Sequence, residues 1–298
     1  LENRPAADEA ATDMLESGSA IELETAVDRR DGLWAIRGEQ IGNLLHKTLE
    51  LALPQPDEDR MVRSLDSAME FESFRLTPRQ LEAMTESQFK DAMLVWLWQI
   101  ADVPLLEGSS VTLGNLSGRA IRRELDFHLS IRTDAGARGV IRNRIDALRN
   151  AGEFGHAEDW QRVLDFIGAV HMQGFLKGSA DLVFEHEGQY FVLDYKSNVL
   201  DGDPANFSHQ RIDTLAMRNP GGYWMQAFLY TLVLHRLLRD RLGADYDPQA
   251  HLGGAIYVFA RGIGEADAGP RGGIWHERFD LELIEAADAL LSGMEGEA

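Results

Sequence analysis

The chain has 298 residues, of which 44% are hydrophobic and 26% charged, and this composition is typical of a globular protein with a large buried core. The absence of cysteine excludes disulfides, thiol nucleophiles and sites built on metal–thiolate bonds, so His, Asp and Glu remain as metal ligands. The net charge of −20 argues weakly against nucleic-acid binding, because a local basic patch can still bind phosphate.

No apolar stretch reaches the roughly 20 residues that a membrane-spanning helix needs. The longest stretches, 93–106 and 228–238, are interrupted by polar side chains, and the chain does not open on a signal peptide. We therefore expect a soluble, cytoplasmic protein that does not contact a membrane.

The sequence changes character near Gly38. Residues 1–31 are rich in Ala, Glu and Asp and carry no sustained apolar pattern, which is typical of an acidic linker or a flexible arm. We expect residues 32–298 to form the folded domain, with a helical part over about 38–105 and a sheet with further helices over about 111–298.

Three helices are expected in the helical part. Apolar residues recur at helical spacing from Ile41 until Pro54 ends the run. Similar patterns cover 61–74 and 77–103, and Thr77-Pro78 is a typical helix start.

The period then changes to two, which is the spacing of a half-buried strand: apolar and polar side chains alternate from Glu124 to Ile131. Further strands are expected over 180–184, 190–196 and 254–260, and residues 185–189 are expected to form a hairpin turn. Helices are expected around 160–169, over 223–242 and near the end of the chain, with a loop over 201–222. About five strands flanked by helices make an α/β domain.

The strand over 190–196 carries the candidate chemistry. Alternation places Asp194 and Lys196 on one face. Asp181 begins the preceding strand, and an antiparallel hairpin folds that position back toward Asp194. Two carboxylates and an ammonium group are therefore expected to converge.

Paired carboxylates suit a hard divalent cation such as Mg²⁺, which relieves their repulsion and keeps open positions for water and a phosphate oxygen. Such an ion polarises a phosphodiester and acidifies the attacking water, while a nearby Lys orients the water or stabilises the charge that develops on phosphorus. The grouping thus predicts metal-assisted hydrolysis.

Several blocks of the sequence resemble a known nuclease family. Gly178-Ser179-Ala180-Asp181, followed by Asp194-Tyr195-Lys196, is similar to the PD-(D/E)xK nuclease signature, and residues 193–198 (LDYKSN) resemble the nuclease domain of the RecB subunit of bacterial RecBCD. Further similar blocks, in the same order, are Arg37-Gly38 with His46, Gln226 with Tyr230, and residues 253–259. The resemblance covers roughly residues 35–265.

This resemblance implies a restriction-endonuclease-like PD-(D/E)xK core: a central mixed sheet of about five strands flanked by helices, with a helical N-terminal region. It implies that His46, Asp181 and Asp194 bind the metal together with the main-chain carbonyl of Tyr195. Lys196 would be the catalytic lysine.

Two further elements of the family are matched. Gln226 and Tyr230 correspond to its QxxxY element, and their spacing places both on one helix face, where they would contact DNA or support the site. An additional acidic residue of the family falls on the strand that begins at Glu124. Glu124 is the preferred candidate and Asp126 the alternative, since both lie on the polar face.

The resemblance also implies an activity: a Mg²⁺-dependent exo- and endodeoxyribonuclease of the exodeoxyribonuclease V type, with Mn²⁺ as an alternative ion and Ca²⁺ as one that binds and inhibits. The substrate would be single-stranded ends of unwound duplex DNA, cut to leave 5′-phosphates during double-strand-break repair and homologous recombination. RecC, RecD and RecA would be partners. The sequence contains no Gly-x-x-x-x-Gly-Lys-[Ser/Thr] loop, so we expect no ATP site and a chain equivalent to an excised nuclease domain.

Other interpretations stay open. The fold could serve as a docking module for RecA or partner subunits with little activity in isolation, and a restriction or phage-type nuclease is a third option. Trp96 and Trp98 are expected in the core rather than stacked on bases. Three groups of arginines would either contact phosphates or lie on solvated faces: Arg119, Arg122 and Arg123; Arg138, Arg142 and Arg144; Arg236, Arg239 and Arg241.

Overall fold

The computed structural model describes residues 36, 38–117, 121–131, 135–169 and 174–292, so the predicted arm over 1–31 lies outside the described residues. A five-stranded sheet with the order β1-β2-β3-β4-β5 forms the centre. The strands are β1 (Ile121–Ile131), β2 (Gly174–His186), β3 (Gln189–Lys196), β4 (Leu252–Phe259) and β5 (Ile274–Glu277). The pair β3–β4 is parallel and the other three neighbouring pairs are antiparallel. The expected α/β fold with a mixed sheet is confirmed.

The N-terminal helical region is also present. Its helices are α2 (Glu39–Ala52), α3 (Glu58–Phe71), α4 (Pro78–Ala83) and α5 (Glu86–Asp102). The prediction of one helix over 77–103 was wrong, because Thr85 and Gln88 form a capping box that begins a second helix: Oγ1 of Thr85 accepts a hydrogen bond from the Gln88 amide at 3.2 Å. The predicted helix start at Thr77 is confirmed by the same type of capping box.

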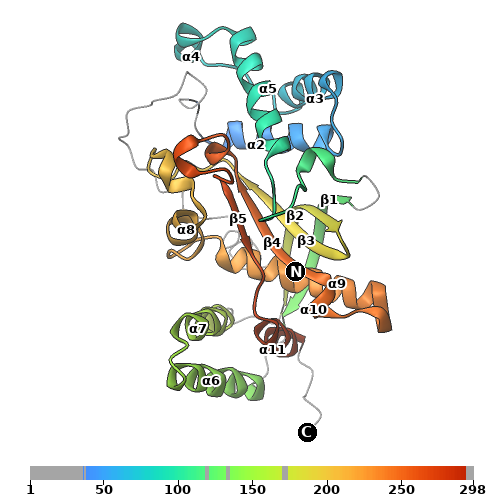
Figure 1. Ribbon diagram of the computed structural model, residues 1–298, viewed down its shortest axis with the longest axis vertical. Coiled ribbons are helices and arrows are strands. Elements are labelled where there is room, and N and C mark those ends of the chain that lie inside the picture. The colour runs from blue at the N-terminus through green and yellow to red at the C-terminus, as the bar shows by residue number, and fades with distance from the viewer. Residues whose placement is uncertain (1–35, 37, 118–120, 132–134, 170–173, 293–298) are drawn as a thin grey trace, which may run out of the picture.

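Helices cover both faces of the sheet. On one face, α2, α3 and α5 pack an apolar cluster against Leu193 and Ile256. On the other face, a second cluster includes Val192 and Tyr257, as the alternation along β3 and β4 requires. The helices on this side are α6 (Ala135–Asn150), α7 (Phe154–Ala169), α9 (Trp224–Leu242) and α11 (Leu281–Ser292). Figure 1 shows α3, α4 and α5 at one end of the molecule and α6, α7 and α11 at the other.

Several local predictions need correction. The turn between β2 and β3 consists of Glu187 and Gly188 rather than five residues, and both have positive φ (51° and 82°), as a tight hairpin turn requires. Helix α6 and strand β5 were not expected. The predicted loop over 201–222 contains helical turns, among them α8 (His209–Ile212), and α10 (Pro248–His251) precedes β4. No helix within the described ranges has the length and apolar character needed to cross a membrane.

Candidate active site

The candidate site lies where β2 and β3 separate. Leu182 and Leu193 form the last paired positions of this antiparallel ladder on that side, so Asp181 and Asp194 stand at the fork. Instead of continuing the ladder, Oδ2 of Asp181 accepts a hydrogen bond from the Tyr195 amide at 2.7 Å. The hairpin therefore brings the two carboxylates into one place, and the side chain of Asp181 is fixed against the backbone of β3.

His46 reaches the fork from helix α2, which packs on the sheet face opposite to α9. Nδ1 of His46 lies 3.3 Å from Oδ1 of Asp181, and its ring packs edge-on against Tyr195 with centroids 5.7 Å apart. Burial disfavours the imidazolium, but Asp181 and Asp194 outweigh this effect and raise the pKa of His46. Burial likewise opposes ionisation of Asp181, yet His46 and the Tyr195 amide hold its pKa below the usual range.

Asp194 and Lys196 form a buried ion pair on the α9 face of β3. Nζ of Lys196 lies 2.8 Å from Oδ2 of Asp194, whose side chain is 6% exposed. Burial raises the pKa of Asp194, and nearby Asp181 adds to the rise even though the Lys196 ammonium opposes it. Burial would lower the pKa of Lys196, but Asp194 more than compensates and raises it. Both members of the ion pair are thus shifted toward their protonated forms.

Glu124 and Asp126 differ in their relation to this fork. The register on either side, Arg123 with Leu182 and Leu125 with Ala180, places Glu124 across from Asp181. Glu124 has a positive φ of 46°, and burial together with Asp181 raises its pKa. Asp126 stands opposite Ser179 instead, farther from the fork. Of the two predicted candidates, Glu124 is the one that lies beside Asp181.

Gln226 and Tyr230 are buried and belong to a chain of hydrogen bonds behind the fork. The Tyr257 hydroxyl donates to Oε1 of Gln226 at 2.9 Å, and Nε2 of Gln226 donates to the Tyr230 hydroxyl at 3.0 Å. The Tyr230 hydroxyl in turn donates to the Ser179 carbonyl at 2.7 Å. The chain runs from β4 through α9 to β2, two residues before Asp181. Of the two roles left open for this pair, the geometry favours support of the site over contact with DNA.

The side chains at the fork fit a hard cation chemically, although they do not surround one point as they stand. Across the described ranges, no group of three or more His, Asp and Glu side chains is gathered closely enough to hold a metal ion. Oδ2 of Asp194 is nevertheless buried, and apart from its contact with Lys196 it makes no hydrogen bond with any described residue. A cation bound by His46, Asp181 and Asp194 together would therefore need these side chains to move closer to one another.

Comparison with known proteins identifies relatives of the chain. The chain is 35% identical to the RecBCD enzyme subunit RecB of Escherichia coli over 259 residues, which cover 87% of the chain and 19% of that protein. The identity is 28% over 278 residues for RecB of Haemophilus influenzae (92% of the chain, 20% of the protein) and 31% over 240 residues for RecB of Mycobacterium tuberculosis (76% and 21%). The chain is a homologue of part of RecB.

The similarity to RecB confirms the resemblance predicted from the motifs. The chain spans about a fifth of the length of these RecB subunits, so the relation concerns one segment of a much longer protein. No model of a protein family matches the chain.

Two aromatic residues at the fork were missed by the sequence analysis. Nζ of Lys196 lies 4.2 Å from the ring centroid of Tyr223 and 5.5 Å from that of Tyr257, within the range of cation–π attraction. Tyr257 is paired with Asp194 in the register of β3 and β4. Tyr257 alternates with Ala255 and Phe259 on one face of the predicted strand, and this pattern could have predicted its position. No local sequence pattern predicts the position of Tyr223.

The three predicted groups of arginines make different contacts. Arg236 and Arg239 both pair with Asp288, and Arg144 pairs with Glu282 at 2.5 Å; these side chains stabilise helix packing. Arg123 donates to the Glu50 and Leu53 carbonyls at the end of α2. Arg119 lies outside the described residues, and Arg138 and Arg142 line a groove considered below. Trp96 and Trp98 pack in or against the core, as expected.

Proposed function

We propose that this chain is a metal-dependent DNA nuclease domain of the RecB type. The observation that carries the proposal is the meeting of His46, Asp181, Asp194 and Lys196 at one fork in the sheet, in a segment similar to RecB over most of its length. Two carboxylates, an imidazole and an ammonium group in this arrangement suit phosphodiester hydrolysis better than other chemistry, because they provide cation ligands and a positive charge for the phosphate.

In this proposal His46, Asp181 and Asp194 bind Mg²⁺, with the Tyr195 carbonyl as a further ligand, Mn²⁺ as a substitute and Ca²⁺ as an inhibitor. The bound ion would supply Lewis-acid polarisation of the phosphate and a more acidic attacking water. Lys196, which contacts Asp194 at 2.8 Å, would offer its ammonium to the phosphate oxygens or orient the water.

Gln226, Tyr230 and Glu124 would support the metal ligands and Lys196. Gln226 and Tyr230 hold the backbone at Ser179 and so fix the start of the segment that carries Asp181. Glu124, across from Asp181, adds a third carboxylate that holds water or a second cation.

The wider role is proposed from the similarity to RecB. The domain would cut single strands released from an unwound duplex, leaving 5′-phosphate ends, as part of a RecBCD-type enzyme in double-strand-break repair and homologous recombination. RecC, RecD and RecA would be its partners, and the cytoplasm its location.

A cleavage assay tests the proposal. End-labelled linear single-stranded and duplex DNA are incubated with the chain and Mg²⁺, and the products are tested for ligation, which requires 5′-phosphates. Asp194→Asn and Lys196→Met should each lower the rate by about 10²–10³-fold, whereas Lys90→Met, at a surface lysine of α5, should leave it unchanged. Equal rates in all four proteins would show that the cleavage comes from elsewhere.

A second function, a docking module for RecA or partner subunits, is favoured by the net charge of −20, because an acidic domain binds DNA weakly on its own. The nuclease and docking functions are distinguished by assaying cleavage over a range of salt concentrations and testing RecA binding in parallel. Retention of RecA without cleavage at any salt would support the docking module.

A further inference from the structure

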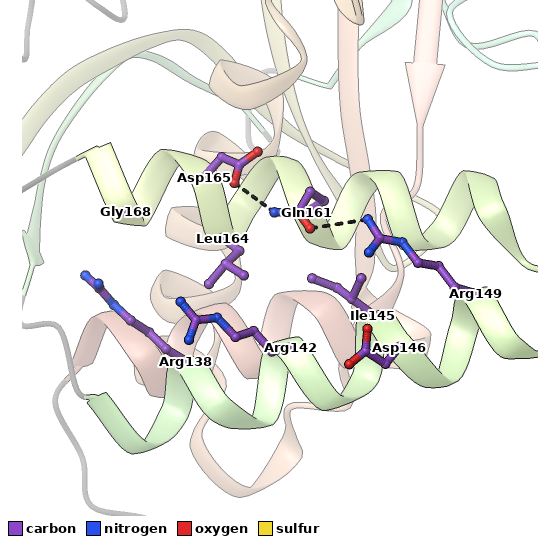
Figure 2. Close-up of a pocket in the computed structure, with 9 residues that line it drawn as sticks. All are labelled: Arg138, Arg142, Ile145, Asp146, Arg149, Gln161, Leu164, Asp165 and Gly168. Atoms are coloured by element: carbon purple, nitrogen blue, oxygen red, sulfur yellow. Dashed lines mark hydrogen bonds between the residues drawn. The ribbon is translucent and has the colours of Figure 1, made fainter.

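Between helices α6 and α7 lies a groove that is open to solvent and distant from the fork. The groove has a volume of about 550 Å³, and Arg138, Arg142 and Arg149 of α6 line one side of it. Figure 2 shows the side chains of Arg138 and Arg142 directed into the space between the two helices, with apolar Leu164 beside them. We call this feature the arginine groove.

The arginines of this groove differ from the other arginines of the helical layer. Within the described ranges, no ion pair joins Arg138, Arg142 or Arg149 to a carboxylate, although Arg144 on the same helix pairs with Glu282. Arg138 donates to the Ile167 carbonyl at 3.3 Å and Arg149 to Gln161 at 3.4 Å. Arg138 and Arg142 lie one helical turn apart on the same side of the groove, so together they form a local positive site on a chain with a net charge of −20.

Acidic residues reduce the positive charge of this site without cancelling it, because three arginines and two aspartates line the groove. Asp146 and Asp165 also line the groove, but Asp165 accepts a hydrogen bond from Gln161 at 2.8 Å, and in Figure 2 its carboxylate points away from Arg142. At the Arg138 end the groove is bordered by Gly168, and a Cβ added there would have no atom of the described residues within 4 Å. Arg142 is exposed and Arg138 is half-buried, so a ligand can reach both guanidinium groups.

The arginine groove is connected to the fork by a two-stranded ribbon. Strand β3 pairs with residues 182–186 of β2, whereas residues 174–180 pair with β1. Beyond the fork the ribbon continues from the pair Leu125–Ala180 to the pair Ile131–Gly174, about 20 Å at the rise of a strand. Helices α6 and α7 form the connection at its far end (Figure 1).

We propose that Arg138 and Arg142 bind phosphate groups of a single DNA strand at a site separate from the carboxylate fork. Guanidinium groups are suited to phosphate oxygens in charge and geometry, and a strand held here and along the ribbon would lead to the fork. The groove would attract DNA locally, although the net charge of the whole chain is unfavourable for DNA binding. This inference rests on the proposed function in taking DNA as the ligand, but the site is defined by binding alone.

The test is direct binding of a fluorescein-labelled oligothymidylate to the full chain, measured by anisotropy in EDTA so that no cleavage occurs. The salt dependence is measured from about 50 to 200 mM. Loss of two phosphate contacts in Arg138→Gln/Arg142→Gln should reduce the slope of log K against log salt by about 1.4, at ~0.7 per contact on a single strand. Arg142→Gln alone, which removes no hydrogen bond of the described structure, should reduce it by about half as much.

The control is Arg63→Gln/Arg79→Gln, which changes the net charge equally at two exposed arginines of α3 and α4 and should leave the slope near that of the wild type. Equal slopes for both double variants, or no measurable binding by the wild type at the lowest salt, would overturn the proposal. So would loss of poly-glutamate binding with unchanged DNA binding in the Arg138/Arg142 variant, which would assign the groove to an acidic protein. Failure of the nuclease function would appear separately, as absent cleavage by the wild type while the Arg138→Gln/Arg142→Gln variant still shows the reduced slope.

Discussion

Removal of one hydroxyl group, in Tyr230→Phe, tests whether the hydrogen-bond chain behind the fork positions Asp181. The hydroxyl accepts from Gln226 at 3.0 Å and donates to the Ser179 carbonyl at 2.7 Å, and both side chains are buried. At about 1 kcal/mol for each neutral hydrogen bond, we expect a loss of roughly 2 kcal/mol in the free energy of unfolding. Because Ser179 lies two residues from Asp181, the Mg²⁺ concentration for half-maximal cleavage should rise about 10-fold or more, as for residues that orient metal ligands.

Tyr246→Phe is the matched control, since its hydroxyl bonds Nδ1 of His235 at 2.9 Å farther along α9. It should cost about 1 kcal/mol of stability and leave the Mg²⁺ dependence unchanged. Urea unfolding and cleavage over a Mg²⁺ series measure the two quantities. If Tyr230→Phe is destabilised as expected but cleaves with the Mg²⁺ dependence of the wild type, the chain of hydrogen bonds is structural only.

Two further predictions concern stability. Burial raises the pKa of Asp159 to about 6 despite the nearby Arg218 guanidinium; the folded state then holds more protons than the unfolded one between pH ~4 and ~6, so this group's contribution to stability falls as pH rises through that window. Urea unfolding of the wild type relative to Asp159→Asn should therefore show a difference that declines by about 1–2 kcal/mol across the window, and a constant difference would contradict it. Gly254→Ala should cost about 1–3 kcal/mol, because Gly254 has a φ of +100° and an added Cβ would lie 2.2 Å from the Glu277 carbonyl oxygen; an unchanged urea midpoint would show that the strand shifts freely.

The parts of the site that the sequence could predict are those set by local geometry. The period-two pattern of 190–196 determines that Asp194 and Lys196 share a face, and the hairpin determines that Asp181 lies close to them. Helix α9 was predictable for a similar reason, since its pattern is long and continuous, and its observed bounds differ from the prediction by one residue.

The parts that could not be predicted depend on contacts between distant segments. The hydrogen-bond chain joins positions near 179, 226 and 257, and no local pattern links them. Helix α6 was missed because Gly136 and Gly139 near its start weaken the helical signal, while its buried Ile141, Ile145 and Leu148 follow helical spacing that could have revealed it. Strand β5 has four residues, too few for a period to be recognised.

The location of a bound cation tests the central claim most directly. Crystals soaked in Mn²⁺ would be measured at a wavelength where manganese scatters anomalously. We expect a peak at the fork, about 2.0–2.3 Å from carboxylate oxygens of Asp181 and Asp194 and from a ring nitrogen of His46. A peak elsewhere, or a fork that holds no ion at saturating Mn²⁺, would contradict this claim.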